Sequence, residues 1–200
     1  MNPSRLELAI KNKDLKMIDI IFKEDNIHSE FGIEFEEINS IEVLEHITSK
    51  IKLSNDTMEH VMYNSFKDDN IDLFIHLILK CKINPSFSNN ILLREISKEG
   101  KIAFLKVLLT NTDVKPNAND NDAINSAIIN KQELAALHLS RQKIVYEDES
   151  IHRAIRFAFI NKMFSVVFEL WKHEISREHL KFRNKKLYDK INKIKNIKDF

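Results

Sequence analysis

Three residues near the C-terminus resemble part of a zinc-protease motif. His173 and Glu174 begin like an HExxH helix, in which two histidines four residues apart bind zinc and the glutamate is the general base. The next histidine, His179, lies six residues after the first. At about 100° per residue the two imidazoles are about 120° apart on the helix surface, too far to share a metal ion. No other pair of histidines has ligand spacing, so the sequence predicts no metal site.

Acidic residues cluster at three places where paired carboxylates could act as general acid and base. The clusters are Glu34, Glu36 and Glu37; Asp68 and Asp69; and Glu147, Asp148 and Glu149. The third cluster precedes Ser150 and a predicted helix that begins at Ile151. Negative charge and a hydroxyl group favour a helix N-terminus, so we interpret this cluster as a helix start and not as a catalytic pair.

Two scarce residue types exclude further chemistry. Cys81 is the one cysteine, which excludes a disulfide framework and a multi-cysteine zinc site. Lys80 and Lys82 would lower its pKa, but no aligned histidine lies nearby, and we expect a passive thiol. The two glycines, Gly32 and Gly100, are too few for a phosphate-cradling loop. We therefore expect no catalytic residue, no cofactor and no enzymatic activity.

Composition and charge indicate a folded protein without a global affinity for polyanions. The 200 residues include 31 basic and 30 acidic side chains, a net charge of +1, and 43% are hydrophobic. No apolar run reaches the length of a membrane span, and the N-terminus lacks the apolar core of a secretion signal. We expect an intracellular protein, cytoplasmic or nuclear, that does not enter a membrane.

The elements that must position any functional residue recur along the chain. An apolar spacing that follows Gly100 at Phe104, Leu105, Leu108 and Leu109 is repeated elsewhere after a turn residue. The turn residues are Asn39, Asn70, Gly100, Asn130 and Asn161, at spacings of 31, 30, 30 and 31 residues. A period near thirty over about six units predicts a stack of modules, each of which contacts only its neighbours.

Each period reads as two short amphipathic helices. The first has an i, i+3, i+4, i+7 stripe, as at Met58, Val61, Met62 and Ser65. A turn follows, at which asparagine or glycine would tolerate a left-handed backbone. We expect more than about 60% helix, antiparallel helices within each module and no sheet beyond short hairpins. Side chains expected in the core are Ile75, Ile78, Leu105, Leu108 and Trp171.

Two segments carry a resemblance to a known family. Residues 83–109 end in Phe-Leu-Lys-Val-Leu-Leu, which is similar to the Val-Val-x-x-Leu-Leu helix of ankyrin repeats. Residues 113–139 have Asp113-Val114 where ankyrins have Asp-Val-Asn and Ser126-Ala127 where they have paired alanines. The Thr-Pro-Leu-His signature is replaced by residues 121–124, Asn-Asp-Ala-Ile, which removes the hydrogen bonds that it makes between repeats. The chain thus resembles a degenerate ankyrin-repeat protein over residues 56–171.

The resemblance implies an all-α solenoid of about six ankyrin-like helix–turn–helix repeats, with short connectors in place of full β-hairpins. We expect a single domain over residues 1–200. Its modules are predicted at residues 4–34, 35–55, 56–89, 90–120, 121–149 and 150–175, with a basic C-terminal capping helix at 176–200. The regions Ser4–Phe22 and Ser176–Ile194 are expected to cap the two ends.

The resemblance also implies a function, which is a non-enzymatic scaffold or adaptor that binds a partner protein through the concave face of the stack. The residues expected on that face are Asn89, Asn90, Arg94, Asn119, Asn121, Asp122 and Asn125. The alternative is a nucleic-acid-associated protein that uses the basic segment Lys181–Phe200, which has eight cations against two acids. We favour a cap for this segment because Leu180, Leu187, Ile191 and Ile194 recur at helical spacing.

Overall fold

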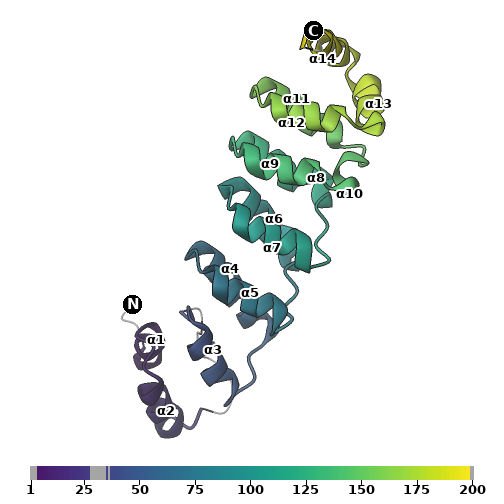
Figure 1. Ribbon diagram of the computed structural model, residues 1–200. Coiled ribbons are helices and arrows are strands. Elements are labelled where there is room, and N and C mark those ends of the chain that lie inside the picture. Colours follow the sequence, from purple (N-terminus) through teal and green to yellow (C-terminus); the bar gives the residue numbers. More distant parts are fainter. Residues whose placement is uncertain (1–3, 28–34, 36, 199–200) are drawn as a thin grey trace. The chain divides into compact units, whose positions relative to one another are not determined.

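All regular secondary structure in the described part of the chain is helical. The computed structural model describes residues 4–27, 35 and 37–198 (Figure 1). Helices account for 72% of the part of the chain that is described, and no strand occurs in these ranges. The predicted all-α class and helix content are confirmed. No described helix combines the length and apolarity that crossing a membrane requires. Glu34, Glu36 and Gly32 lie outside the described residues.

Contacts divide the chain into two compact units, Met1–Pro85 and Ser86–Phe200, where the sequence predicts one domain. The boundary lies in a proline-containing connector. Unit 1 contains α1 (Arg5–Lys11), α2 (Leu15–Glu24), α3 (Ile41–Thr48), α4 (Asn55–Lys67) and α5 (Ile71–Leu79). Helix α1 packs against α2, α4 against α5, and α3 against α5. The predicted N-terminal cap is therefore a hairpin of two helices, and the module at 35–55 contributes one described helix, α3.

Side-chain caps start the helices of unit 1. At each start, one side-chain oxygen accepts a hydrogen bond from the backbone N–H three residues later, which satisfies a donor that the helix leaves free. The capping residues are Ser4, Asp14, Ser40, Ser54 and Asn70. Asn70 thus begins α5, whereas the sequence reading placed it in a left-handed turn.

The turns inside the hairpins have their left-handed residue at a position other than asparagine. Positive φ occurs at Lys13, Asp69, Gly100, Lys131 and Lys162. Asn130 has a φ of −88°. The prediction of a left-handed conformation is confirmed for Gly100 but wrong for asparagine, because in the other four turns that conformation lies one residue away from the asparagine.

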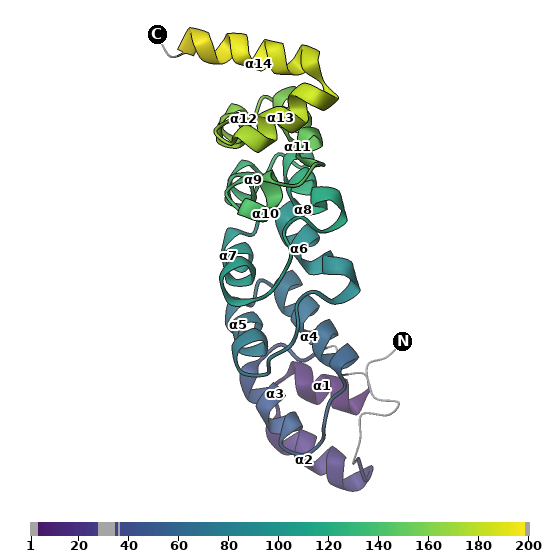
Figure 2. The ribbon, with the colours of Figure 1, turned by 90° about the vertical axis from the view of Figure 1, so that its right-hand side faces the viewer.

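Unit 2 consists of two rows of helices with a terminal pair (Figure 2). Its helices are α6 (Phe87–Glu99), α7 (Ile102–Asn111), α8 (Ala118–Ile129), α9 (Glu133–Ser140), α10 (Lys143–Tyr146), α11 (Ile151–Ile160), α12 (Phe164–Trp171), α13 (Glu174–Arg183) and α14 (Lys185–Lys198). Helix α8 packs against α6 and α11 in one row, and α9 packs against α7 and α12 in the other. The predicted C-terminal capping helix is two helices, α13 and α14, separated at Asn184.

The cores of both units follow the predicted apolar stripe with one exception. Leu105 and Leu108 are fully buried, Ile78 is 5% exposed and Trp171 is 3% exposed, which confirms these four predictions. Ile75 is only half-buried. The buried stripe of α5 consists of Leu73, Phe74, Leu77 and Ile78, and Ile75 lies outside that stripe on the helix surface.

Candidate protein-binding surface

Helices α6 and α8 both begin with a left-handed turn. Ser88, Asn89 and Asn90 have φ values of 44°, 60° and 61°. Residues 119–121, which are Asn, Asp and Asn, have φ values of 52°, 58° and 62°. Asparagine and aspartate tolerate this conformation better than other residues with a side chain. The repeated turn, 31 residues apart, explains why the segments are rich in asparagine.

Hydrogen bonds between the two turns join one hairpin to the next. The Asn89 side-chain amide donates to Asn119 Oδ1 at 2.9 Å. The Asn119 amide donates in return to the Asn89 backbone carbonyl at 3.2 Å. Both side chains remain exposed, so the pair forms an ordered polar surface at the helix starts.

Two charged residues extend this surface. Arg94 Nη1 lies 3.4 Å from Asp122 Oδ2, and each side chain is 39% exposed. An exposed pair of this kind contributes at most about 1 kcal/mol, so both groups can exchange this partner for another. A hollow of about 10 Å³ lies beside them, lined by residues that include Asn90 and Lys115. This volume is at the lower limit for one water molecule, which makes the feature a surface and not a ligand pocket.

Asn121 and Asn125 are not on this surface. Asn121 is fully buried, and its amide donates to Ser150 Oγ at 2.9 Å and to the Val145 carbonyl at 3.3 Å. Asn125 is 8% exposed and donates to the Asp120 carbonyl at 3.2 Å. The expectation that both are free for a partner is wrong, because both side chains are buried. Asn121 joins α8 to residues 145 and 150, whereas the bond of Asn125 lies within α8.

Sequence reasoning missed further polar residues at the helix starts of unit 2. Asp120 Oδ2 accepts a hydrogen bond from Arg153 at 2.8 Å, and Asn117 donates to Asp148 at 3.1 Å. Asn117 and Asp148 are 31 residues apart, so the repeat period itself was a signal for this pair. We define the helix-start row as the residues that remain at least partly exposed on these turns, which are Asn89, Asn90, Arg94, Asn119, Asp120 and Asp122.

The acidic cluster before α11 has a structural role at its centre. Asp148 accepts hydrogen bonds from the Ser150 backbone N–H at 2.8 Å and from the Ser150 hydroxyl at 2.6 Å. Burial raises the pKa of Asp148, but the hydrogen bonds from Ser150 and Asn117 outweigh burial and hold that pKa below its usual range. Glu147 and Glu149 pair with Lys143 and Arg183. The predicted helix start is confirmed, with Ser150 as the N-cap residue of α11. The predicted hydroxyl cap is wrong, because the Ser150 hydroxyl donates to Asp148 and makes no capping hydrogen bond to α11.

Cys81 and the histidine motif show no catalytic arrangement among the residues described. Burial and, to a smaller extent, the Glu45 carboxylate raise the pKa of Cys81, which opposes the effect expected from its neighbouring lysines. His173 lies at the N-terminal boundary of α13, and Glu174 is its first residue. Within the described ranges, no three His, Cys, Asp or Glu side chains come together as a metal-binding group would.

The basic C-terminal segment buries part of its apolar stripe. Leu180 and Ile191 are buried, whereas Leu187 and Ile194 are half-buried. The Tyr188 ring lies 5.2 Å from the Trp171 ring. Lysines cover the rest of the segment, and those with described exposed side chains are Lys181, Lys185, Lys186, Lys190, Lys193 and Lys195. Helices α13 and α14 therefore bury an apolar face, as a terminal cap would, and also present a basic surface.

Comparison with known proteins adds no relative to this description. No family model, no curated protein and no solved structure matches the chain. The class that the structure defines is an all-α protein built of helical hairpins.

Proposed function

We propose that this chain is a non-enzymatic, intracellular scaffold or adaptor that binds a partner protein through ankyrin-like helical repeats. In this proposal the partner contacts the helix-start row, on the side that corresponds to the concave face of an ankyrin stack. The observation that carries the proposal is the repeated left-handed turn with its reciprocal Asn89–Asn119 pair. The reciprocal bonds hold the two amide groups in a fixed arrangement, and a preorganised surface loses little side-chain entropy on binding.

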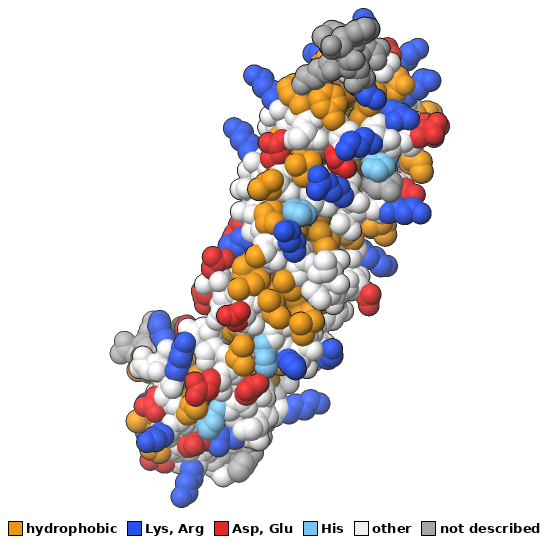
Figure 3. Space-filling model, in the orientation of Figure 1, with side chains coloured by type: hydrophobic (Ala, Val, Ile, Leu, Met, Phe, Trp, Pro, Cys, Tyr) orange, Lys and Arg blue, Asp and Glu red, His pale blue; other side chains and the backbone are white. Residues whose placement is uncertain are grey.

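The apolar residues of unit 2 support the same proposal. Most of them are buried in packing between hairpins, although Ile129, Leu134 and Ile160 are more than half exposed. The helix starts and the connectors have no such packing role and are available for recognition. On the face drawn in Figure 3, basic and acidic side chains are interspersed with apolar ones and do not gather into one charged patch. This mixture favours a partner with a mixed polar surface over a uniformly charged one.

Affinity capture with matched variants tests the proposal. Asp122→Arg reverses one charge of the helix-start row, and the double variant Arg94→Asp/Asp122→Arg reverses the ion pair while keeping it intact. Lys106→Glu is the control, because Lys106 is exposed on α7, which packs with α9 and lies outside the helix-start row. We expect both helix-start variants to lose a partner, identified by mass spectrometry, that the wild type and Lys106→Glu retain. Loss only with Lys106→Glu would contradict the proposal.

The alternative, a nucleic-acid-associated protein, rests on the exposed lysines of α13 and α14. Phe182 is 83% exposed and available to stack on a base, whereas Tyr188 packs against Trp171. Binding of the full chain to short duplex and single-stranded nucleic acid, measured across a salt series, tests this function. Sub-micromolar affinity that falls steeply with salt and disappears on deletion of Lys185–Phe200 would support the alternative over the scaffold.

A further inference from the structure

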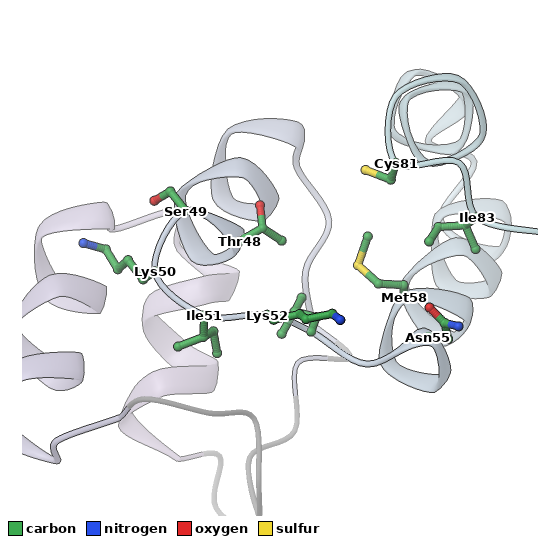
Figure 4. A pocket seen from close by; sticks show the side chains of 10 residues that line it. Thr48, Ser49, Lys50, Ile51, Lys52, Asn55, Met58, Cys81 and Ile83 are labelled. Carbon is green, nitrogen blue, oxygen red and sulfur yellow. The ribbon is translucent and has the colours of Figure 1, made fainter.

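A cleft of about 440 Å³ opens in unit 1 between the α3–α4 connector and the end of α5 (Figure 4). Its volume lies in the range of ligand-binding clefts. Thr48 faces the cleft from the end of α3, Met58 extends towards it from α4, and Cys81 projects towards it from the segment that follows α5. The lining is Thr48, Ser49, Lys50, Ile51, Lys52, Leu53, Asn55, Met58, Cys81 and Ile83.

The connector that forms one wall has the pattern of a β-strand with no partner strand. Ile51 and Leu53 are 4% and 7% exposed, while Lys52 between them is exposed. Buried and exposed side chains alternate in this way along an extended strand with one covered face. In the described part of the chain, the backbone groups of Lys52 and Leu53 make no hydrogen bond to another backbone group. Unpaired backbone groups of this kind can pair with another extended chain.

The charge of the lining selects between possible occupants. Among the described residues of the lining, Lys50 and Lys52 are charged and none is a carboxylate. Lys50 Nζ lies 2.7 Å from Asp19 Oδ1, whereas Lys52 forms no ion pair with any described residue. Among the residues that the structure describes, the cleft therefore presents Lys52 as an available cation, next to unpaired backbone groups and the apolar side chains of Met58 and Ile83.

We propose that this cleft binds an extended, acidic peptide segment of a partner protein. The peptide backbone pairs with the connector at Lys52 and Leu53, a carboxylate of the peptide lies near Lys52, and an alternate apolar side chain contacts Met58 and Ile83. Backbone pairing supplies affinity in this mode of recognition, and the alternating side chains supply specificity. The site lies in unit 1, so it is independent of the helix-start row in unit 2.

Selection from a random peptide library tests the chemistry of the occupant. A phage-displayed library of dodecapeptides is selected on the full chain, and enriched peptides are synthesised and titrated against wild type, Lys52→Glu and Lys16→Glu. Lys16 is an exposed lysine of α2 and serves as the matched control. We expect peptides in which apolar residues alternate with Asp or Glu. Lys52→Glu should weaken their binding about tenfold, as loss of one charge pair predicts, and Lys16→Glu should not.

Cys81 reports whether the peptide occupies this cleft, because it is the protein's one cysteine and lies in the lining. Alkylation by iodoacetamide at about pH 8.5, near the ordinary pKa of a thiol, should slow in proportion to the fraction of chain that is bound. Glutarate, a free dicarboxylate, should give no protection. Failure to enrich acidic peptides, an unchanged alkylation rate at saturating peptide, or equal protection by glutarate would each overturn the proposal.

Discussion

Asn119 and Asn121 have the same left-handed backbone conformation but different surroundings. Their φ values are 52° and 62°. Asn119 is exposed and bonds to another surface side chain, whereas Asn121 is fully buried and donates to Ser150 and Val145. Because the cost of the backbone conformation is similar at both positions, a comparison between them isolates the contribution of the buried hydrogen bonds.

We expect Asn121→Ala to lower the free energy of unfolding by about 1–3 kcal/mol more than Asn119→Ala, since it leaves buried groups unpaired. Urea titration of the two variants measures this difference. Equal losses at the two positions would show that the buried bonds contribute nothing beyond the surface pair.

Lys131 has a left-handed backbone conformation, which is unfavourable for a residue with a β-carbon. Lys131 has a φ of 60° in the turn between α8 and α9, and its side chain is exposed. Lys131→Gly should raise the free energy of unfolding by about 0.5–1 kcal/mol, because glycine adopts this conformation without steric strain. Lys131→Ala removes the charge but keeps the strain, so it should not stabilise the protein. Thermal denaturation of both variants provides the measurement.

Substitution of two adjacent leucines of α7 shows how much the packing of this helix contributes to the free energy of unfolding. Leu108 is fully buried, whereas Leu109 is half-buried. Leu108→Ala should cost about 2–5 kcal/mol, from lost apolar burial and the cavity that remains. Leu109→Ala on the same helix should cost less than half as much. Urea unfolding compares the two, and similar losses would contradict the packing assigned to α7.

Asp148 links stability to pH through the elements that it joins. It connects the start of α11 to Asn117, next to α8, and its pKa is lower in the folded chain than in the unfolded one. Its stabilising contribution is therefore present above the unfolded pKa of about 4 and is lost as the pH falls through the folded pKa. We expect Asp148→Asn to destabilise the protein at pH 7 and to have a smaller effect at pH 3.

Urea unfolding at both pH values tests this dependence. Asp113→Asn is the control, because Asp113 is an exposed aspartate of the same unit. An effect of Asp148→Asn that does not change between the two pH values would exclude the proposed linkage.

The sequence predicted most helices but not how they begin and end. Apolar spacing predicts a helix wherever one face of the helix is buried against a neighbour, as in α7 and α12. The turns at residues 88–90 and 119–121 consist mainly of polar residues, which carry no apolar period. The break at Asn184 was missed for a different reason, because the apolar positions on either side of it continue at helical spacing. The two left-handed turns make hydrogen bonds with another hairpin, at Asn89, Asn119 and Asn121, whereas Asn184 makes local bonds that start α14.

Polar contacts repeat with the same period as the apolar ones across each unit. In unit 1, Lys50 pairs with Asp19 and the Asn70 amide donates to the Asn39 carbonyl, both over 31 residues. In unit 2, Asn117 and Asp148 have the same separation. The period was readable from the sequence, but the division of asparagines between surface and interior was not. Asn89 and Asn121 are equally polar and differ only in what surrounds them.

Because each hairpin packs against its neighbours, a defect at the C-terminal end of unit 2 should weaken the unit from that end. Ile191 of α14 is 1% exposed, whereas Lys193 on the same helix is exposed. In Ile191→Ala, amide hydrogen exchange followed by mass spectrometry should accelerate most in α13 and α14 and less in α11 and α12. Exchange in α6 and α7 should not change, and Lys193→Ala should leave all helices protected. A uniform acceleration across unit 2 would mean instead that its hairpins unfold as one cooperative body.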